Sequence, residues 1–314
     1  MDPATDQPLS FNGKPVVAVP AGAEYVSDPV TFTAAPLSDL VVTMLIGSAP
    51  AVPTLHAGAH ETAFLVRRDH VTDAQLNSPQ TFTRWYFLAG VEVDRDVHNR
   101  GTVIALGDSI TDGHGSTTDR NDRWPDILAR RLNTGASALH LGVINEGIGG
   151  NRVLQDGIGP GLMARFYRDV LAQDGVRTVI LLEGINDLGG LDRLEEHPLA
   201  AHQALVTDLE SALQQLVTQA HARGVRVLGA TLTPFIGSDY YHPSPATEAD
   251  RQSLNQWIRS RGIFDGVIDF DAAVRDPAHP DRLLPSADSG DHLHPGPEGY
   301  QRMGDAVPLT LLAK

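Results

Sequence analysis

The sequence predicts an α/β domain over residues 99–314, preceded by a smaller β-rich module over residues 1–98. Three observations carry this prediction. From residue 100 onward, five apolar runs alternate with helical segments, which is typical of a parallel sheet with helices on both faces. Before residue 98, short apolar runs are broken by nine of the 21 prolines, and no segment has apolar residues at helical spacing. A long apolar stripe at helical spacing, within residues 201–223, belongs to the second region only.

The first region is predicted to be an antiparallel β-sandwich or jelly-roll-like module, because short strands with frequent breakers are typical of such folds. No reactive residues are concentrated there, so we expect an accessory role. The strands are expected in the apolar runs at 15–20, 25–32, 40–46, 63–66 and 85–93.

The second region is predicted to be a three-layer α/β/α domain with about five parallel strands. Its clearest helix carries Leu205, Leu209, Leu213 and Leu216 on one face, and Gly224 follows its end as glycine often does. The strands are expected at 103–106, 139–144, 179–182, 225–230 and 267–270. The helices are expected at 124–132, 160–171, 201–223, 247–261 and 297–312.

Composition excludes several classes of protein. The 24 basic and 39 acidic residues give a net charge of −15, and no basic run is present, so we expect no nucleic-acid partner. With no cysteine, the chain has no disulfide, no thiolate metal ligand and no cysteine nucleophile. No apolar stretch is long enough for a membrane span, and the N-terminus lacks the pattern of a signal peptide. An export signal removed earlier would be consistent with this N-terminus.

Polar or glycine-rich segments follow the first three predicted strands. Ser109 follows the first strand, Gly150 lies within residues 145–151 after the second, and Asn186 follows the third. The carboxyl ends of parallel strands meet at one edge of a sheet, where ligands bind in such folds. Each residue alone also has a structural explanation, since serine and asparagine cap helices or form turns, and glycine allows tight turns.

Near the C-terminus, Asp291 and His294 are three residues apart. In a helical turn, the carboxylate of such a pair can accept a hydrogen bond from the imidazole and orient it as a base. Together with Ser109, Gly150 and Asn186, the pair completes the requirements for acyl transfer: a nucleophile, a base with its orienting group, and donors for an oxyanion.

Other chemistries have less support. The motif G-x-S-x-G is absent, which argues against the standard α/β-hydrolase design, and residues 145–152 do not form the dinucleotide-binding pattern G-x-G-x-x-G. An alternative makes Asp291, His292 and His294 metal ligands. No other histidine and aspartate cluster in the sequence converges on them, so we predict no metal and no cofactor.

The same residues resemble the SGNH (GDSL) hydrolase superfamily. Residues 107–109 are similar to its first sequence block, Gly150 to its second, residues 184–187 to its third and residues 291–294 to its fifth. The resemblance covers about residues 100–314 and implies a flavodoxin-like arrangement of the sheet. Isoleucine at position 185 departs from the glycine that is frequent in the third block.

Further residues resemble the branch of this superfamily that is related to xylan-associated esterases. Members of that branch carry a β-rich region before the catalytic domain and are exported, which implies a secreted or periplasmic location. The residues that carry this second resemblance are Trp124, Pro125, Asn151, Arg152, Arg165, Phe166, residues 168–171 and residues 183–187.

The resemblance implies a role for each matching residue. Ser109 is the nucleophile, His294 the base and Asp291 its orienting carboxylate. The backbone N–H groups of Ser109 and Gly150 and the side-chain amide of Asn186 form the oxyanion hole. The candidate substrate contacts are Asp108, Asn151, Arg152, Asp187 and His292.

The expected activity is hydrolysis of short-chain acyl esters, above all acetyl esters on carbohydrates, through an acyl-enzyme. The expected partner is therefore a small-molecule or carbohydrate ester. One alternative keeps the site but makes the protein a lipase, thioesterase or acyltransferase. Another makes it a non-catalytic carbohydrate-binding protein that acts through residues 1–98.

Overall fold

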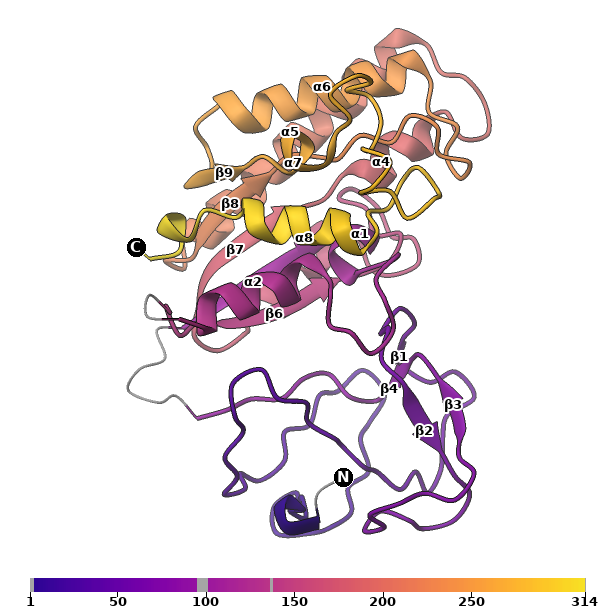
Figure 1. The fold of residues 1–314 in the computed structure, drawn as a ribbon, viewed down its shortest axis with the longest axis vertical. Helices are drawn as coiled ribbons and strands as arrows, with labels where there is room; N and C mark the ends of the chain where they lie inside the picture. The colour runs from indigo at the N-terminus through magenta and orange to yellow at the C-terminus, as the bar shows by residue number, and fades with distance from the viewer. Residues whose placement is uncertain (1–2, 95–100, 136–137, 314) are drawn as a thin grey trace. The chain divides into compact units, whose positions relative to one another are not determined.

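The structure is a computed structural model that describes residues 3–94, 101–135 and 138–313 (Figure 1). It divides into two compact units. One comprises Met1–Ala57 and Glu61–Asp94, and the other comprises Gly58–His60 and Arg95–Lys314. The predicted boundary between residues 98 and 99 lies outside the described residues.

The N-terminal unit contains two short antiparallel strand pairs. Strand β1 (Leu55–His56) pairs with β4 (Trp85–Tyr86), and β2 (Ala63–Leu65) pairs with β3 (Gln80–Phe82). A short 3-10 helix, η1 (Pro3–Thr5), precedes them. The antiparallel strands agree with the expected β-rich character, but over residues 3–94 they form two separate two-stranded sheets.

The prediction of strands at 15–20, 25–32 and 40–46 is wrong, because no strand forms in these three runs. Their apolar side chains, such as Val26 and Val41, are exposed rather than packed under a second layer. Alternating apolar residues and breakers specify an extended chain, but a strand also requires a partner that pairs with its backbone.

The second unit is built on one parallel sheet of five strands in the order β6-β5-β7-β8-β9. In that order the strands are Gly142–Gly147, Thr102–Gly107, Val176–Leu182, Arg226–Ala230 and Gly266–Ile268. All four pairings are parallel, and Ile104 at the centre aligns with Ile144 on one side and Val179 on the other. This is the predicted flavodoxin-like order. The chain reverses its direction across the sheet beside β5, where ligands bind in such folds.

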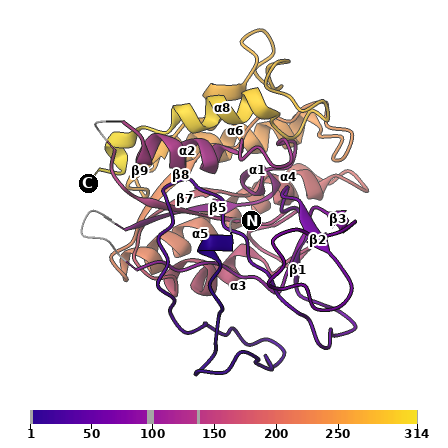
Figure 2. The same cartoon turned by 60° about the horizontal axis from the view of Figure 1, so that its bottom comes forward.

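Helices cover both faces of this sheet, as predicted. Figure 2 shows α2 (Trp124–Asn133) and α8 (Pro297–Ala306) on one side and α3 (Leu162–Phe166) and α5 (Leu199–His221) on the other. Helix α6 (Pro245–Ser260) packs against α5. Within the described part of the chain, none of the helices has the length and apolar character needed to cross a membrane.

Two predicted helices are interrupted. Residues 160–171 form α3 and then a π-helical turn, η2 (Tyr167–Leu171), rather than one continuous α-helix. Helix α8 stops at Ala306, and a 3-10 turn, η3 (Leu309–Leu311), follows. Pro308 lies between them, and proline has no N–H to continue a helical ladder.

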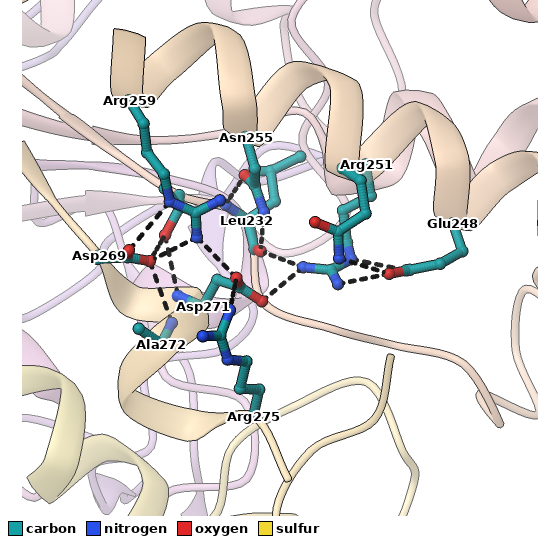
Figure 3. A network of polar contacts seen from close by, with 11 residues as sticks. Leu232, Glu248, Arg251, Asn255, Arg259, Asp269, Asp271, Ala272 and Arg275 are labelled. Atoms are coloured by element: carbon teal, nitrogen blue, oxygen red, sulfur yellow. Dashed lines mark hydrogen bonds and ion pairs between the residues drawn. The ribbon is translucent and has the colours of Figure 1, made fainter. Parts of the chain in front are cut away.

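A buried ionic network joins α6 to α7 (Phe270–Val274). Asp271 is fully buried and lies between three arginines (Figure 3). Its Oδ1 accepts from Arg251 at 2.8 Å, and its Oδ2 accepts from Arg259 at 2.7 Å and from Arg275 at 3.1 Å. Arg251 also donates to the carbonyl oxygen of Leu232 at 2.9 Å, so the network holds the segment that follows β8.

Candidate active site

Ser109 lies where strand β5 turns into the short helix α1 (Ser109–Asp112). Asp108 caps this helix, because its Oδ1 accepts from the backbone N–H of Ile110 at 2.8 Å. The turn is very tight: a Cβ on Gly107 would lie 2.3 Å from the Leu182 carbonyl oxygen, and a Cβ on Gly147 would lie 2.1 Å from the backbone nitrogen of Asp112. Glycine at both positions therefore allows Ser109 to stand at the carboxyl edge of the sheet.

Ser109, His294 and Asp291 form a continuous chain of hydrogen bonds. The Oγ of Ser109 lies 2.8 Å from Nε2 of His294, and Nδ1 of His294 lies 2.6 Å from Oδ2 of Asp291. Because a carboxylate only accepts, Nδ1 carries the proton and Nε2 is free to accept from Ser109. The sequence predicted all three residues, and the fold brings them together across 185 positions of the chain.

Asp291 is held in its ionised form. Its Oδ1 accepts from the backbone N–H groups of Leu293 and His294, at 3.0 and 2.8 Å. Burial alone would raise the pKa of Asp291, but the hydrogen bonds from the side chain and backbone of His294 outweigh burial and lower the pKa below its ordinary value. The turn 291–294 thus orients the carboxylate and the imidazole at the same time.

Asn186 is the second residue of α4 (Ile185–Leu191), directly after β7. Its Nδ2 donates to the carbonyl oxygen of Asn151 at 2.7 Å, and its Oδ1 accepts from the hydroxyl of Tyr241 at 2.6 Å. Gly150, next to Asn151, has a left-handed backbone (φ 71°). The amide of Asn186 and the segment 150–151 are therefore joined by a direct bond.

Arg165 is a structural residue of the site that sequence reasoning noted only through resemblance. It is buried, and its guanidinium donates to the carbonyl oxygens of Gly107 and Glu146 at the ends of β5 and β6, at 2.9 and 2.8 Å. It also donates to Oδ1 of Asn151 and to Asp169, at 2.8 and 2.9 Å. Its position inside a helix gave no signal that it binds the ends of two strands.

Three of the five candidate substrate contacts face the interior. Asp108, Asn151 and Asp187 are buried. Asp187 accepts from the backbone nitrogens of Val153 and Leu154, and the side chain of Asn151 donates to the carbonyl oxygen of Pro160.

The other two candidate contacts, Arg152 and His292, retain solvent exposure. Nδ1 of His292 lies 2.5 Å from Oδ2 of Asp288.

His114, which the sequence left without a role, lies against the imidazole of His294. The two ring centroids are 4.1 Å apart, and Nε2 of His114 lies 3.8 Å from Oδ2 of Asp291. Burial and the neighbouring His294 lower the pKa of His114. The group of potential metal ligands found in the described part of the chain is thus His114, Asp291 and His294, in which His114 replaces the His292 of the sequence alternative.

Buried carboxyl groups beside Ser109 make the free energy of unfolding depend on pH. Burial raises the pKa of Asp108 from 3.8 to about 7 and that of Asp187 from 3.8 to about 6, and raises the pKa of Glu183 as well. Between the ordinary and the raised values, the unfolded chain releases these protons while the folded chain keeps them. Ionisation therefore favours unfolding as pH rises through this range.

We expect the free energy of unfolding to fall between pH 5 and pH 8, and Asp108→Asn to reduce that fall, because it removes a group that titrates at about 7 in the folded protein. Urea unfolding of wild type and variant at both pH values measures the difference. An equal fall in the free energy of unfolding of both proteins would contradict the attribution of this pH dependence to Asp108.

The parallel sheet with a Ser–His–Asp chain of hydrogen bonds at its carboxyl edge places the protein among the hydrolases of the SGNH superfamily. Residues 105–302 match the model of the GDSL-like lipase/acylhydrolase family, and the chain belongs to this family. It is accordingly a hydrolase of ester substrates. No match was found among curated proteins.

Solved structures are similar to this chain at low identity. Axe2, an acetylxylan esterase from Geobacillus stearothermophilus, is 21% identical, and the alignment covers 69% of this chain and 96% of that one with a TM-score of 0.49. A GDSL-like lipase from Bacteroides thetaiotaomicron is 18% identical. That alignment covers 68% of this chain and 88% of the lipase, with a TM-score of 0.47.

Proposed function

We propose that this protein is a serine esterase that removes short acyl groups, above all acetyl groups, from carbohydrate esters through an acyl-enzyme. The observation that carries the proposal is the hydrogen-bonded chain from Ser109 through His294 to Asp291, at 2.8 and 2.6 Å. Nucleophile, base and orienting carboxylate within hydrogen-bond distance are what nucleophilic ester cleavage requires.

The reaction follows from this chain. Ser109 Oγ attacks the ester carbonyl carbon while His294 Nε2 takes its proton, and Asp291 stabilises the imidazolium that results. The imidazolium then protonates the departing alkoxide, which leaves an ester of Ser109. A water molecule attacks that ester with His294 again as base, and the acid is released.

The negative charge on the carbonyl oxygen is proposed to be held by the backbone N–H groups of Ser109 and Gly150 and by Nδ2 of Asn186. One hydrogen of Nδ2 is directed to the Asn151 carbonyl oxygen, and the second is left for substrate. A donor that is already oriented before the charge develops stabilises the transition state without reorganisation.

We expect Asn186→Ala to lower kcat by about 10²- to 10³-fold, the cost typical of one lost oxyanion donor. KM should change little, because the donor is needed most in the transition state. Steady-state kinetics on p-nitrophenyl acetate measure both constants, with circular dichroism to verify the fold. An unchanged kcat would remove Asn186 from the proposed oxyanion hole.

A pocket beside the catalytic turn, with both polar and apolar lining residues, is proposed to hold the sugar part of the substrate. The pocket, of about 530 Å³, is bordered by Asp288 and His292, which flank Asp291 in sequence. The lining also includes the polar side chains of Asp239, Asp276, His279 and Arg282 and the apolar side chains of Ile236, Leu283 and Pro285. The polar side chains in this lining offer donors and acceptors to sugar hydroxyl groups. In this proposal Arg152 and His292 are the substrate contacts, since the other candidates are buried.

The proposal is tested by the acyl-chain preference on p-nitrophenyl esters from acetate to laurate, with EDTA present. We expect the highest kcat/KM for acetate and no effect of EDTA. Preference for octanoate or laurate would favour the lipase alternative, and loss of activity in EDTA would favour metal ligands in place of the serine mechanism.

The carbohydrate part is tested with an acetylated xylo-oligosaccharide against p-nitrophenyl acetate. His279→Ala should raise KM for the oligosaccharide alone. An equal effect on both substrates would count against the pocket as the sugar site. Glycan binding by a protein that hydrolyses neither substrate would favour the non-catalytic alternative.

The domain organisation and location are proposed on the same basis. Residues 1–98 would form the accessory module and residues 99–314 the catalytic domain. A carbohydrate ester outside the cell would be consistent with a secreted or periplasmic protein.

A further inference from the structure

A second imidazole beside the catalytic one creates a set of potential zinc ligands. One ligand atom each from His114, Asp291 and His294 lies within 4.8 Å of the other two. Two imidazole nitrogens and one carboxylate oxygen form a ligand set common in zinc sites with an open position. The side chains of His114 and Asp291 are 59% and 40% exposed, so an ion in solution can reach them.

The backbone holds His114 in this position. Its N–H donates to the carbonyl oxygen of Ser109 at 2.9 Å, and its carbonyl oxygen accepts from the buried hydroxyl of Tyr300 at 2.6 Å. The side chain of His292, a ligand in the sequence-based metal alternative, is directed to Asp288 instead. The bonds to Ser109 and Tyr300 fix the backbone of His114 beside the catalytic pair.

We propose that His114, Asp291 and His294 form an inhibitory site for Zn²⁺, in which the ion binds Nε2 of His114, Oδ2 of Asp291 and Nδ1 of His294. The ion takes the place of the proton between Nδ1 and Oδ2, and that proton is released to solvent. Zinc bonds of about 2.0–2.2 Å separate neighbouring ligand atoms by roughly 3.4 Å. The 3.8 Å between His114 and Asp291 is close to this spacing, and the 2.6 Å between Asp291 and His294 must widen.

Zinc binding at Nδ1 of His294 stops catalysis by preventing proton uptake at Nε2 of the same ring. An imidazole that carries Zn²⁺ on Nδ1 accepts a second positive charge on Nε2 poorly, so His294 no longer takes the proton of Ser109. Asp291 is also withdrawn from its role of stabilising the imidazolium. The esterase activity is therefore lost when Zn²⁺ binds.

The test compares Zn²⁺ inhibition of wild type, His114→Ala and His292→Ala in a non-chelating buffer, each relative to its own uninhibited rate on p-nitrophenyl acetate. We expect wild type and His292→Ala to be inhibited at the same Zn²⁺ concentration, and His114→Ala to require at least tenfold more. EDTA should reverse the inhibition, and Mg²⁺, which prefers oxygen ligands, should not inhibit. Equal inhibition of wild type and His114→Ala would overturn the proposal.

A binding measurement separates this site from the proposed esterase function. Calorimetry of Zn²⁺ on Ser109→Ala, with and without His114→Ala, requires no turnover. Binding that weakens when His114 is removed supports the site even if the substrate is misassigned. Zn²⁺ affinity that is unchanged without His114 excludes it. His114→Gln serves as a second variant, and circular dichroism verifies each fold.

A different observation carries a second inference, which depends on the proposed oxyanion role of Asn186. Tyr241 is buried, and its hydroxyl donates to Oδ1 of Asn186 at 2.6 Å. Its ring packs on α4, where a Cβ on Gly189 would lie 2.6 Å from the Tyr241 ring. An amide has two orientations related by a flip. The Asn151 carbonyl oxygen can only accept, so it selects the orientation that directs Nδ2 toward it, and the Tyr241 hydroxyl then donates to Oδ1 and holds the amide there.

The geometry points to Tyr241 as a positioning residue that holds the amide of Asn186 in place. Tyr241→Phe should lower kcat about tenfold with little change in KM. Tyr240→Phe is the matched control, because Tyr240 is half exposed and its hydroxyl accepts from Arg193 rather than contacting Asn186. In an Asn186→Ala background, Tyr241→Phe should cause no further loss, because the amide that it orients is gone.

A purely structural role would lower kcat by the same factor in both backgrounds, and that result would overturn the inference. If Asn186→Ala alone had no effect, the oxyanion assignment would fail first, so the two failures are distinguishable. Thermal unfolding of each variant verifies that the kinetics refer to folded protein.

Discussion

Ser109→Ala is expected to lower kcat on p-nitrophenyl acetate by about 10⁴- to 10⁶-fold, the range found when a serine nucleophile is removed from a triad. The Oγ of Ser109 lies 2.8 Å from His294, and no other hydroxyl of the described residues is hydrogen-bonded to that imidazole. The variant should fold normally, because Asp108 caps α1 without the Ser109 side chain. Initial rates with purified variant and wild type give the ratio.

Ser116→Ala is the matched control for this experiment. Ser116 lies in the loop that follows α1, and its hydroxyl has no hydrogen-bond partner in the structure. Its removal should leave kcat within twofold of wild type. If Ser109→Ala kept most of the activity, the acyl-enzyme mechanism would be wrong, whatever the substrate preference.

Asp271→Ala is expected to lower the free energy of unfolding by about 3–5 kcal/mol, which is typical when one partner of a buried ion pair is removed. The loss removes one of the two carboxylates that pair with the fully buried guanidinium of Arg251 and leaves it with Glu248. Arg259 loses its 2.7 Å bond to Oδ2 at the same time. Urea unfolding followed by circular dichroism gives the difference.

Two variants make this result specific. Arg275→Ala removes the most exposed arginine of the network, 42% accessible, and should cost less than about 1 kcal/mol. Asp271→Asn keeps the size of the side chain but not its charge, and should cost nearly as much as alanine. A small effect of both Asp271 variants would mean that the buried charges do not contribute to the stability of α6 and α7.

The sequence predicted the parts of the fold in which a local pattern is strong. Each of the five strands of the parallel sheet overlaps one of the predicted apolar runs, and α5 carries leucines at helical spacing. Helices α1, α4 and α7 were missed, because four to seven residues are too few to show a helical period. The predicted strands at 15–20, 25–32 and 40–46 did not form for a different reason, because strand pairing depends on a partner elsewhere in the chain.

The residues of the candidate site were also predicted only in part. Ser109, Asn186, Asp291 and His294 were found because each follows a strand or stands in a short motif. Tyr241 and His114 were not, because their contacts exist only in three dimensions: Tyr241 reaches Asn186 across 55 positions. The contacts of Arg165 could not be predicted from the sequence, because they depend on where strands β5 and β6 end in the fold.

The close approach at Gly107 and Gly147 has a consequence for any deep mutational scan of this chain. Neither residue has a side chain to offer substrate, yet a single methyl group at either would meet backbone atoms at 2.3 or 2.1 Å and displace α1. Both positions would therefore score as intolerant as Ser109 in an activity selection. A parallel selection for folded protein should separate them: substitutions at the two glycines should reduce abundance, whereas those at Ser109 should not.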